Sequence, residues 1–134
     1  MENLFITSDK EKLDLKFITG FISQSYWAKE RTLEMMQKCI DNSLNFGIFL
    51  DGKQVGYARV VTDYVQFAYL MDVFIDKVNQ GKGYSGILME HILQTESLKG
   101  VKVWRLATSD AHGLYRKFGF TELKKPENMM ELIR

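Results

Sequence analysis

The spacing of apolar residues along the chain predicts helices in its first third. In residues 13–22 apolar side chains recur every three or four positions, and the same spacing returns in residues 33–44. This spacing places the apolar side chains on one face of an α-helix. We therefore predict two amphipathic helices, preceded by a short apolar run, Leu4–Ile6, that predicts a first strand.

From residue 46 the pattern becomes that of strands. The runs Phe46–Leu50 and Val55–Val61 are rich in β-branched and aromatic residues and flank the pair Asp51–Gly52. An Asp-Gly pair between two such runs is a strong signal for a β-hairpin, so we predict an antiparallel pair. The nearly continuous apolar run Phe67–Ile75 predicts a third strand that is buried on both faces.

A β-α-β unit is predicted next. A helical stripe of apolar residues at 87–93 follows a glycine-rich turn, and the run Val101–Ala107 returns to strand character. A crossover between parallel strands of one sheet is right-handed. We therefore expect the strand at 101–107 to lie parallel to the strand at 67–75 and close to it.

The last predicted elements are a short helix and a strand. Asp110 is a candidate cap for a helix over residues 111–118, whose C-terminal end is marked by Gly119. A final strand is predicted to begin at Phe120. Helices and strands of both pairing types together indicate an α+β fold.

Length and composition are those of one globular domain. The chain has 134 residues, of which 46% are hydrophobic and 26% charged, and this profile excludes a disordered protein. We expect a single domain over residues 1–134. The 18 basic and 17 acidic side chains leave a formal charge of +1, so neither nucleic acid nor an acidic membrane is an expected partner.

Cysteine and histidine are too scarce for a structural disulfide or a zinc site. Cys39 is the only cysteine, and the two histidines, His91 and His112, are not at a spacing that zinc sites use. We therefore expect no metal. The first ten residues lack a basic region followed by an apolar one, and no stretch approaches the ~20 apolar residues of a membrane span, so we expect a cytoplasmic protein.

The glycine-rich turn Asn79–Gly86 is the first candidate for chemistry. It lies between a predicted buried strand and an amphipathic helix, so the unpaired N–H groups of the helix start and the helix dipole favour an anion there, and Lys82 adds a charge. Such a loop is suited to phosphate, although the same glycines also suit a plain connector. The spacing of Gly81, Gly83 and Gly86 fits a dinucleotide fingerprint, but the loop follows a third strand instead of opening the fold.

Two motifs, in the expected order and at the expected separation, resemble a known family. Gln80-Gly-Lys-Gly-Tyr-Ser85 is similar to the acyl-CoA pyrophosphate loop, Gln/Arg-x-x-Gly-x-Gly/Ala, of the GNAT superfamily of N-acyltransferases. The segment from Thr108 to Phe120 is similar to that superfamily's later signature, Asn-x-x-Ala-x-x-Leu-Tyr-x-x-x-Gly-Phe. Ser85 stands where the family prefers Gly or Ala, and Thr108 replaces the usual Asn.

The resemblance implies an acetyl-CoA-dependent N-acetyltransferase of the GNAT fold, with a mixed central sheet whose parallel strands splay apart. It implies that a primary amine of a small molecule or peptide attacks the thioester directly, in a ternary complex. Pantetheine would pair with the backbone near residue 74, and an N–H there would stabilise the oxyanion. The residues implied to bind the cosubstrate acetyl-CoA are Val73, Phe74, Ile75, Gln80, Gly81, Lys82, Gly83, Tyr84, Ser85 and Gly86.

Two residues are candidates for catalysis. By the resemblance, Tyr115 is the general acid near the sulfur: a phenol, with an ordinary pKa of about 10, is protonated at neutral pH and can stabilise the developing thiolate. Packing beside Leu114 and Phe118 is the alternative. Strand alternation places Asp72 on the same face as Leu70 and Phe74, where a carboxylate is either paired structurally or used as a catalytic or substrate-orienting group.

The acceptor is the least defined partner. Tyr26 and Trp27 lie in a predicted loop, where they can either line the acceptor pocket or pack a helix against the domain. Homodimers are common in the GNAT family, and a partner chain would complete the short acceptor wall after Phe120. A non-catalytic CoA-binding module is the alternative function. A dinucleotide-dependent oxidoreductase is more distant, because the strand at 101–107 has no acidic residue for a ribose.

Overall fold

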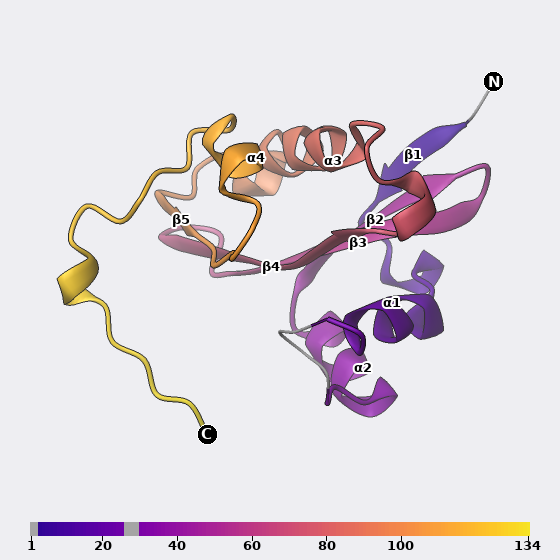
Figure 1. Ribbon diagram of the computed structural model, residues 1–134, viewed down its shortest axis with the longest axis horizontal. Helices are drawn as coiled ribbons and strands as arrows, with labels where there is room; N and C mark the ends of the chain where they lie inside the picture. The colour runs from indigo at the N-terminus through magenta and orange to yellow at the C-terminus, as the bar shows by residue number, and fades with distance from the viewer. Residues whose placement is uncertain (1–2, 26–29) are drawn as a thin grey trace.

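A five-stranded mixed sheet organises the fold (Figure 1). The computed structural model describes residues 3–25 and 30–134. The strands follow chain order in the sheet, the first four pairing antiparallel and the last two parallel. They are β1 (Leu4–Thr7), β2 (Leu44–Leu50), β3 (Lys53–Thr62), β4 (Phe67–Ile75) and β5 (Val103–Arg105). The predicted hairpin and the predicted parallel neighbour of the third strand are both confirmed.

Helices cover both faces of the sheet. The helices α1 (Leu15–Ile22) and α2 (Leu33–Asp41) lie against one face, while α3 (Tyr84–Leu93) and α4 (His112–Arg116) lie against the other (Figure 1). The α+β class is therefore confirmed. Four 3₁₀ turns complete the described elements: Lys10–Lys12, Lys77–Asn79, Glu96–Leu98 and Pro126–Asn128.

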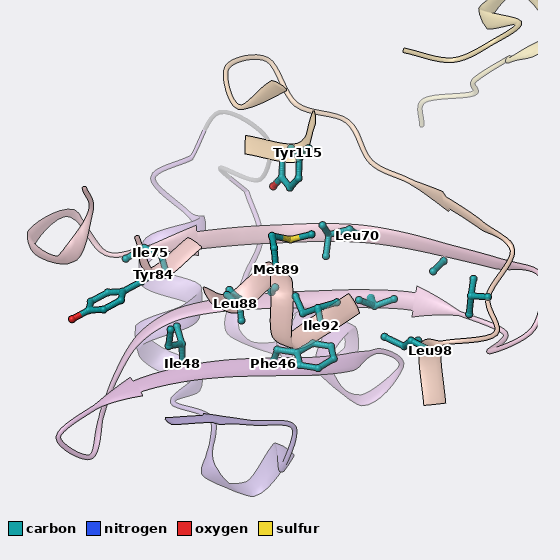
Figure 2. Packing of buried hydrophobic residues seen from close by; sticks show 14 of the residues in the cluster. Phe46, Ile48, Leu70, Ile75, Tyr84, Leu88, Met89, Ile92, Leu98 and Tyr115 are labelled. Carbon is teal, nitrogen blue, oxygen red and sulfur yellow. The ribbon is translucent and has the colours of Figure 1, made fainter. Parts of the chain in front are cut away.

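Each face of the sheet has its own hydrophobic core. The larger core packs α3 against the sheet and joins it to Tyr115 of α4 (Figure 2). The smaller core packs α1 and α2 against Tyr57 of β3 and Phe74 of β4. The apolar stripes that predicted the helices are the surfaces buried here: Ile18, Ile22, Met36 and Ile40 below the sheet, and Leu88, Met89 and Ile92 above it.

A β-bulge in β4 corrects one expectation about side-chain direction. Arg59 pairs with Met71 and Tyr57 pairs with Phe74, so that two residues of β4 lie opposite one residue of β3. Asp72, within the bulge, has a φ of 55°, in the left-handed region. Leu70 therefore belongs to the larger core and Phe74 to the smaller, so the prediction that both lie on one face was wrong.

The end of the chain differs from the prediction. Residues 120–134 contain one 3₁₀ turn and no strand, so the strand predicted from Phe120 is not formed. A strand forms only where a neighbouring strand accepts and donates its backbone hydrogen bonds. A cavity of about 720 Å³ lies between β5 and residues 120–125, so β5 does not serve as that neighbour. Asp110 does not cap α4 either: Ala111 is at the cap position, and the Thr108 hydroxyl accepts the N–H groups of Asp110 and Ala111.

A buried tyrosine ties the smaller core to the start of β2. Tyr57 and Asn45 are both fully buried, and the Tyr57 hydroxyl donates to Asn45 Oδ1. Asn45 Nδ2 donates in turn to the carbonyl oxygens of Ile40 and Ser43, at 2.9 and 3.0 Å. Burial raises the pKa of Tyr57, so the phenol keeps the proton that it donates.

Replacing Tyr57 by phenylalanine is expected to lower the free energy of unfolding by about 1–3 kcal/mol, because Asn45 Oδ1 stays buried without its donor. Chemical denaturation monitored by circular dichroism measures this loss. Tyr64→Phe, at an exposed position, is the matched control and should leave the unfolding midpoint unchanged. Equal effects of the two variants would contradict a structural role for the Tyr57 hydroxyl.

Candidate active site

A cleft opens where the two parallel strands separate. The pairing of β4 with β5 ends at Tyr69 and Arg105, after which β4 continues to Ile75 while residues 106–111 diverge from it. The cavity between them has a volume of about 770 Å³ and is walled by residues 69–75 on one side and residues 106–111 on the other. This size is typical of a site for a small molecule. The splayed arrangement implied by the resemblance is therefore present.

Tyr115 lies at this cleft. It comes from α4, is 8% exposed, and lines the cleft opposite β4. Figure 2 shows its ring pointing from α4 toward the sheet, above Leu70. Phe120 meets the ring edge-on, with the two centroids 5.9 Å apart and the planes at 70°. The phenol is thus held by packing at the wall of the cleft.

The glycine-rich loop forms a second, smaller cavity next to the cleft. Its volume is about 310 Å³, and the residues of the loop and of the first turn of α3 line it. Gly81 and Gly83 have φ values of 79° and 85°, which glycine adopts far more readily than other residues. Gly83 is the N-cap of α3 and provides no side chain, so the first amide groups of the helix are left to face a ligand.

The side chains of the loop divide between holding the loop and facing the cavity. Gln80 Nε2 donates to the carbonyl oxygen of Ile75 at 2.9 Å, which fastens the loop to the end of β4. Lys82 Nζ lies 3.4 Å from Asn79 Oδ1 and does not line the cavity. Lys117, the residue that follows α4, lines it instead. Lys117 was missed in the sequence because it lies 31 residues beyond the loop, and only the fold brings it there.

The predicted cosubstrate residues therefore lie together, with one exception. Val73 and Phe74 line the cleft, Ile75 and Gln80 line both the cleft and the smaller cavity, and the remaining loop residues apart from Lys82 line the smaller cavity. Gly86, in the first turn of α3, has open space where a Cβ would stand. The loop and the cleft are thus neighbours joined through two shared residues.

Asp72 is the centre of a buried ionic cluster. Its side chain is 1% exposed, and its Oδ2 accepts from Arg31 Nη1 at 2.5 Å and from Arg59 Nε at 2.6 Å. Arg59 Nη1 also donates to Ser43 Oγ at 3.0 Å. One carboxylate thus faces two guanidinium groups, which leaves the cluster with a net positive charge. Asp72 and Arg31 both line the cleft, so this charge borders it.

The alternation of side chains along the strand could not predict which residues contact the Asp72 carboxylate. Arg31 precedes α2, 41 residues before Asp72, and neither motif nor spacing connects the two. The predicted substrate contacts Tyr26 and Trp27 lie outside the described residues. Ser25 and Arg31, on either side of that segment, both line the cleft.

Comparison with known proteins identifies the family. Residues 41–122 match the model of the acetyltransferase (GNAT) domain, and this stretch includes the loop, the two strand-derived walls of the cleft and Tyr115. The chain belongs to the GNAT family of acetyltransferases. A GNAT-family protein from Xanthomonas campestris pv. campestris has a crystal structure that is 44% identical in sequence, with a TM-score of 0.95 over 98% of this chain and 94% of that one.

More distant similarities are found to one protein by sequence and to another by fold. An uncharacterized N-acetyltransferase, ycf52-like, from Prochlorococcus marinus is 29% identical over 87% of this chain and 68% of its own. A Clostridium acetobutylicum protein, whose crystal structure is with acetyl-CoA, is 13% identical with a TM-score of 0.63, over 99% of this chain and 96% of that one. The family match identifies the GNAT chain as an acetyltransferase, and the chain shares its fold with a protein whose crystal structure is with acetyl-CoA.

Two further properties of the GNAT chain concern metals and membranes. Among residues 3–25 and 30–134, no group of three or more His, Cys, Asp or Glu side chains is arranged to hold a metal ion. None of the helices in the same two stretches is long and apolar enough to cross a membrane.

Proposed function

We propose that this acetyltransferase transfers the acetyl group of acetyl-CoA to a primary amine of a small molecule or peptide in a ternary complex. The observation that carries the proposal is that the two cavities adjoin. Ile75 and Gln80 line both, so the cavity at the start of α3 is next to the cleft that Tyr115 lines. A long cosubstrate with a diphosphate at one end and a thioester at the other would occupy both.

The loop and α3 are assigned the diphosphate. The first amides of α3 and its dipole favour an anion at Gly83, and Lys117 adds a positive charge from the opposite wall. Lys82 supports the loop through Asn79 and adds charge nearby. Gly86 leaves room for phosphate oxygens to approach the backbone.

The bulge of β4 is assigned the thioester. Asp72 and Val73 are outside the regular ladder of paired residues between β3 and β4. The backbone groups near Val73 therefore do not follow the regular hydrogen-bonding pattern of that ladder. An N–H of residues 73–75 is the proposed donor to the oxyanion that forms when the amine adds to the carbonyl carbon. Preorganised donors of this kind stabilise the charge of the transition state.

Tyr115 is assigned the role of general acid. As the amine nitrogen bonds to the carbonyl carbon, the carbon–sulfur bond breaks, and the electron pair leaves with the sulfur. The Tyr115 hydroxyl lies at the cleft wall and would deliver its proton to that thiolate. The acceptor must enter the reaction as a neutral amine, having lost the proton of its ammonium form.

The sequence allowed two roles for Asp72, as a catalytic group or as a substrate-orienting group, and we assign it the orienting role. To take a proton from the acceptor, its Oδ2 would have to release a guanidinium group that it now holds. Holding Arg31 at the cleft positions the start of α2 and the wall on which the acceptor would rest.

Titration calorimetry with acetyl-CoA tests the cosubstrate site. The wild type is expected to bind acetyl-CoA at micromolar strength and NADH not at all. The double variant Gln80→Ala/Lys82→Ala should lose at least about tenfold in affinity, equivalent to ~1.4 kcal/mol, because the loop is released from Ile75 and loses a charge. Lys38→Ala is the charge-matched control, because Lys38 is an exposed residue of α2, on the face of the sheet opposite α3.

Three outcomes separate the alternatives. Heat with NADH and none with acetyl-CoA would refute the assignment of the loop. Equal loss in the double variant and in Lys38→Ala would show that the loop side chains do not act at the site. Binding of acetyl-CoA without release of free CoA in a screen of primary amines would favour a non-catalytic CoA-binding module.

A further inference from the structure

The ionic cluster beside the cleft carries more positive charge than is needed to neutralise its carboxylate. Asp72 Oδ2 accepts from Arg59 Nε at 2.6 Å, and this pair alone balances one carboxylate with one guanidinium group. Arg59 also donates to Ser43 Oγ and does not line the cleft. Arg31, which does line the cleft, is therefore a second cation on a carboxylate that already has one.

The guanidinium group of Arg31 is only partly used by the protein. Its Nη1 donates to Asp72 Oδ2 at 2.5 Å and to Met36 Sδ at 3.7 Å. Within the part of the chain that the structure describes, Nε and Nη2 of Arg31 have no hydrogen-bond partner. The N–H groups of Nε and Nη2 lie side by side in the guanidinium plane, and this arrangement binds two oxygens of one carboxylate or phosphate.

The burial of the cluster makes its excess charge effective. The side chains of Arg31 and Asp72 are only 15% and 1% exposed. Charges shielded from water are screened less than surface charges, and an excess of buried charge is costly unless an opposite charge reaches it. The other charged residues among the described lining of the cleft are Lys77 and Asp110, which are exposed and opposite in sign. The net charge at the cleft is therefore positive.

The position of Arg31 favours the acceptor over the cosubstrate as its ligand. The glycine-rich loop meets the cleft at Ile75 and Gln80, and neither Arg31 nor Asp72 lines the cavity of that loop. Arg31 leads into α2, which lies against the face of the sheet opposite α3 (Figure 1). A diphosphate at the start of α3 is thus bound by other groups, and Arg31 is left for an anion on the second reactant.

We propose that the acceptor carries an anionic group, a carboxylate or a phosphate, in addition to its primary amine, and that Arg31 binds this group through Nε and Nη2. The proposal rests on the acetyl transfer assigned above and narrows the acceptor to amines such as amino acids and aminoalkyl phosphates. Asp72 positions Arg31 by holding Nη1, which leaves the other two nitrogens to the ligand. The anion neutralises the excess charge of the cluster.

Matched pairs of acceptors test this specificity. β-Alanine and β-alaninamide differ in whether the end far from the amine is a carboxylate or a neutral amide, and O-phosphoethanolamine and ethanolamine make the same comparison for a phosphate. With release of CoA as the readout, the wild type should have the higher kcat/KM for the anionic member of a pair. The pair with the larger preference identifies the anion.

Variants of Arg31 connect the preference to this residue. Arg31→Gln should lower kcat/KM for the anionic member about 10- to 100-fold, chiefly through KM, because a charge-assisted bidentate contact is lost. The neutral member, which does not use the contact, should be unaffected. Arg31→Lys retains the charge without the paired N–H groups and should recover part of the loss.

Arg116→Gln is the matched control. Arg116 is an exposed arginine that pairs with Glu122 and does not line the cleft, so its loss should leave both members of each pair unchanged. If the wild type uses the neutral members as well as the anionic ones, the proposal is overturned. It is also overturned if Arg31→Gln lowers kcat/KM equally for both members of a pair, since Arg31 would then be a structural residue.

Calorimetry separates failure of this proposal from failure of the proposed function. If no amine in the screen releases CoA, the assignment of acetyl transfer fails, and direct binding of the same four amines decides whether Arg31 binds an anion. The wild type should bind β-alanine or O-phosphoethanolamine more tightly than its neutral partner, and Arg31→Gln should remove the difference. Equal affinities within both pairs, or a preference that Arg31→Gln retains, overturns the proposal whatever the activity assay shows.

Discussion

Replacing Tyr115 by phenylalanine is expected to lower kcat by about 10²–10⁴-fold while leaving the affinity for acetyl-CoA unchanged. The substitution removes the one proton donor that we assign to the departing thiolate and retains the ring that packs against Phe120. Loss of an interaction made only as the carbon–sulfur bond breaks affects kcat and not ground-state binding. Release of free CoA thiol, measured with the best amine from a screen, gives kcat, and calorimetry gives the affinity.

Tyr64→Phe is the matched control for this experiment. Tyr64 lies in the turn between β3 and β4, is 45% exposed, and does not line the cleft. Its loss of a hydroxyl should leave kcat unchanged. If Tyr115→Phe retains the wild-type kcat, or loses activity only in proportion to its thermal stability, the general-acid assignment fails and Tyr115 is a packing residue of the cleft wall.

Replacing Asp72 by alanine is expected to lower the free energy of unfolding by about 3–5 kcal/mol. The change leaves two guanidinium groups without their shared carboxylate, and the side chains of Arg31 and Arg59 are only 15% and 8% exposed. A loss of this size is a large part of the 5–15 kcal/mol that stabilises a typical domain. Urea denaturation followed by two optical probes measures it and checks that unfolding stays cooperative.

Two comparisons identify the cause. Asp110→Ala, which removes an exposed carboxylate, should leave the unfolding midpoint unchanged. The triple variant Asp72→Leu/Arg31→Met/Arg59→Met removes all three charges and should recover most of the lost stability, since it leaves no buried charge unpaired. If Asp72→Ala is no less stable than Asp110→Ala, the ionic cluster does not contribute to the stability of the fold.

The parts of the fold that sequence periodicity predicted are those whose cause is local. The hairpin at Asp51–Gly52 depends on turn chemistry, and the helical stripes depend on burying one face, so both could be read from neighbouring residues. The glycine-rich loop was found for the same reason: its left-handed glycines and the start of α3 are adjacent in the chain.

The parts that were missed depend on distant residues. The strand predicted at Phe120 requires a neighbouring strand, and residues 3–25 and 30–134 place none beside it. The pattern of apolar and polar residues in a segment does not predict whether a neighbouring strand exists. Leu44 was assigned to the second helix, but that helix ends at Asp41, and Leu44 pairs with Val60 as the first residue of β2.

In the site, too, residues that are close in the sequence were predicted together, and residues that only the fold brings together were missed. Gln80 and Gly83 lie in one motif and were found together, whereas Lys117 and Arg31 reach the cavities only through the packing of α4 and the approach to α2. Asp63 lies in the turn between β3 and β4. There its carboxylate accepts the N–H groups of Val65, Gln66 and Phe67, which lowers its pKa.

The extra residue in β4 makes the length of this strand as important as its composition. Deleting Val73 would leave Asp72 alone opposite Ala58 and restore regular alternation, with Phe74 still opposite Tyr57 and Ile75 still opposite Gly56. Phe74 would keep its stacking contact with Phe21 of α1, and Ile75 would stay in the core under α3. The side chain that alternation would turn to the other face is that of Asp72, so the deletion would separate the carboxylate from Arg31 and Arg59 while the two helical layers stay in place.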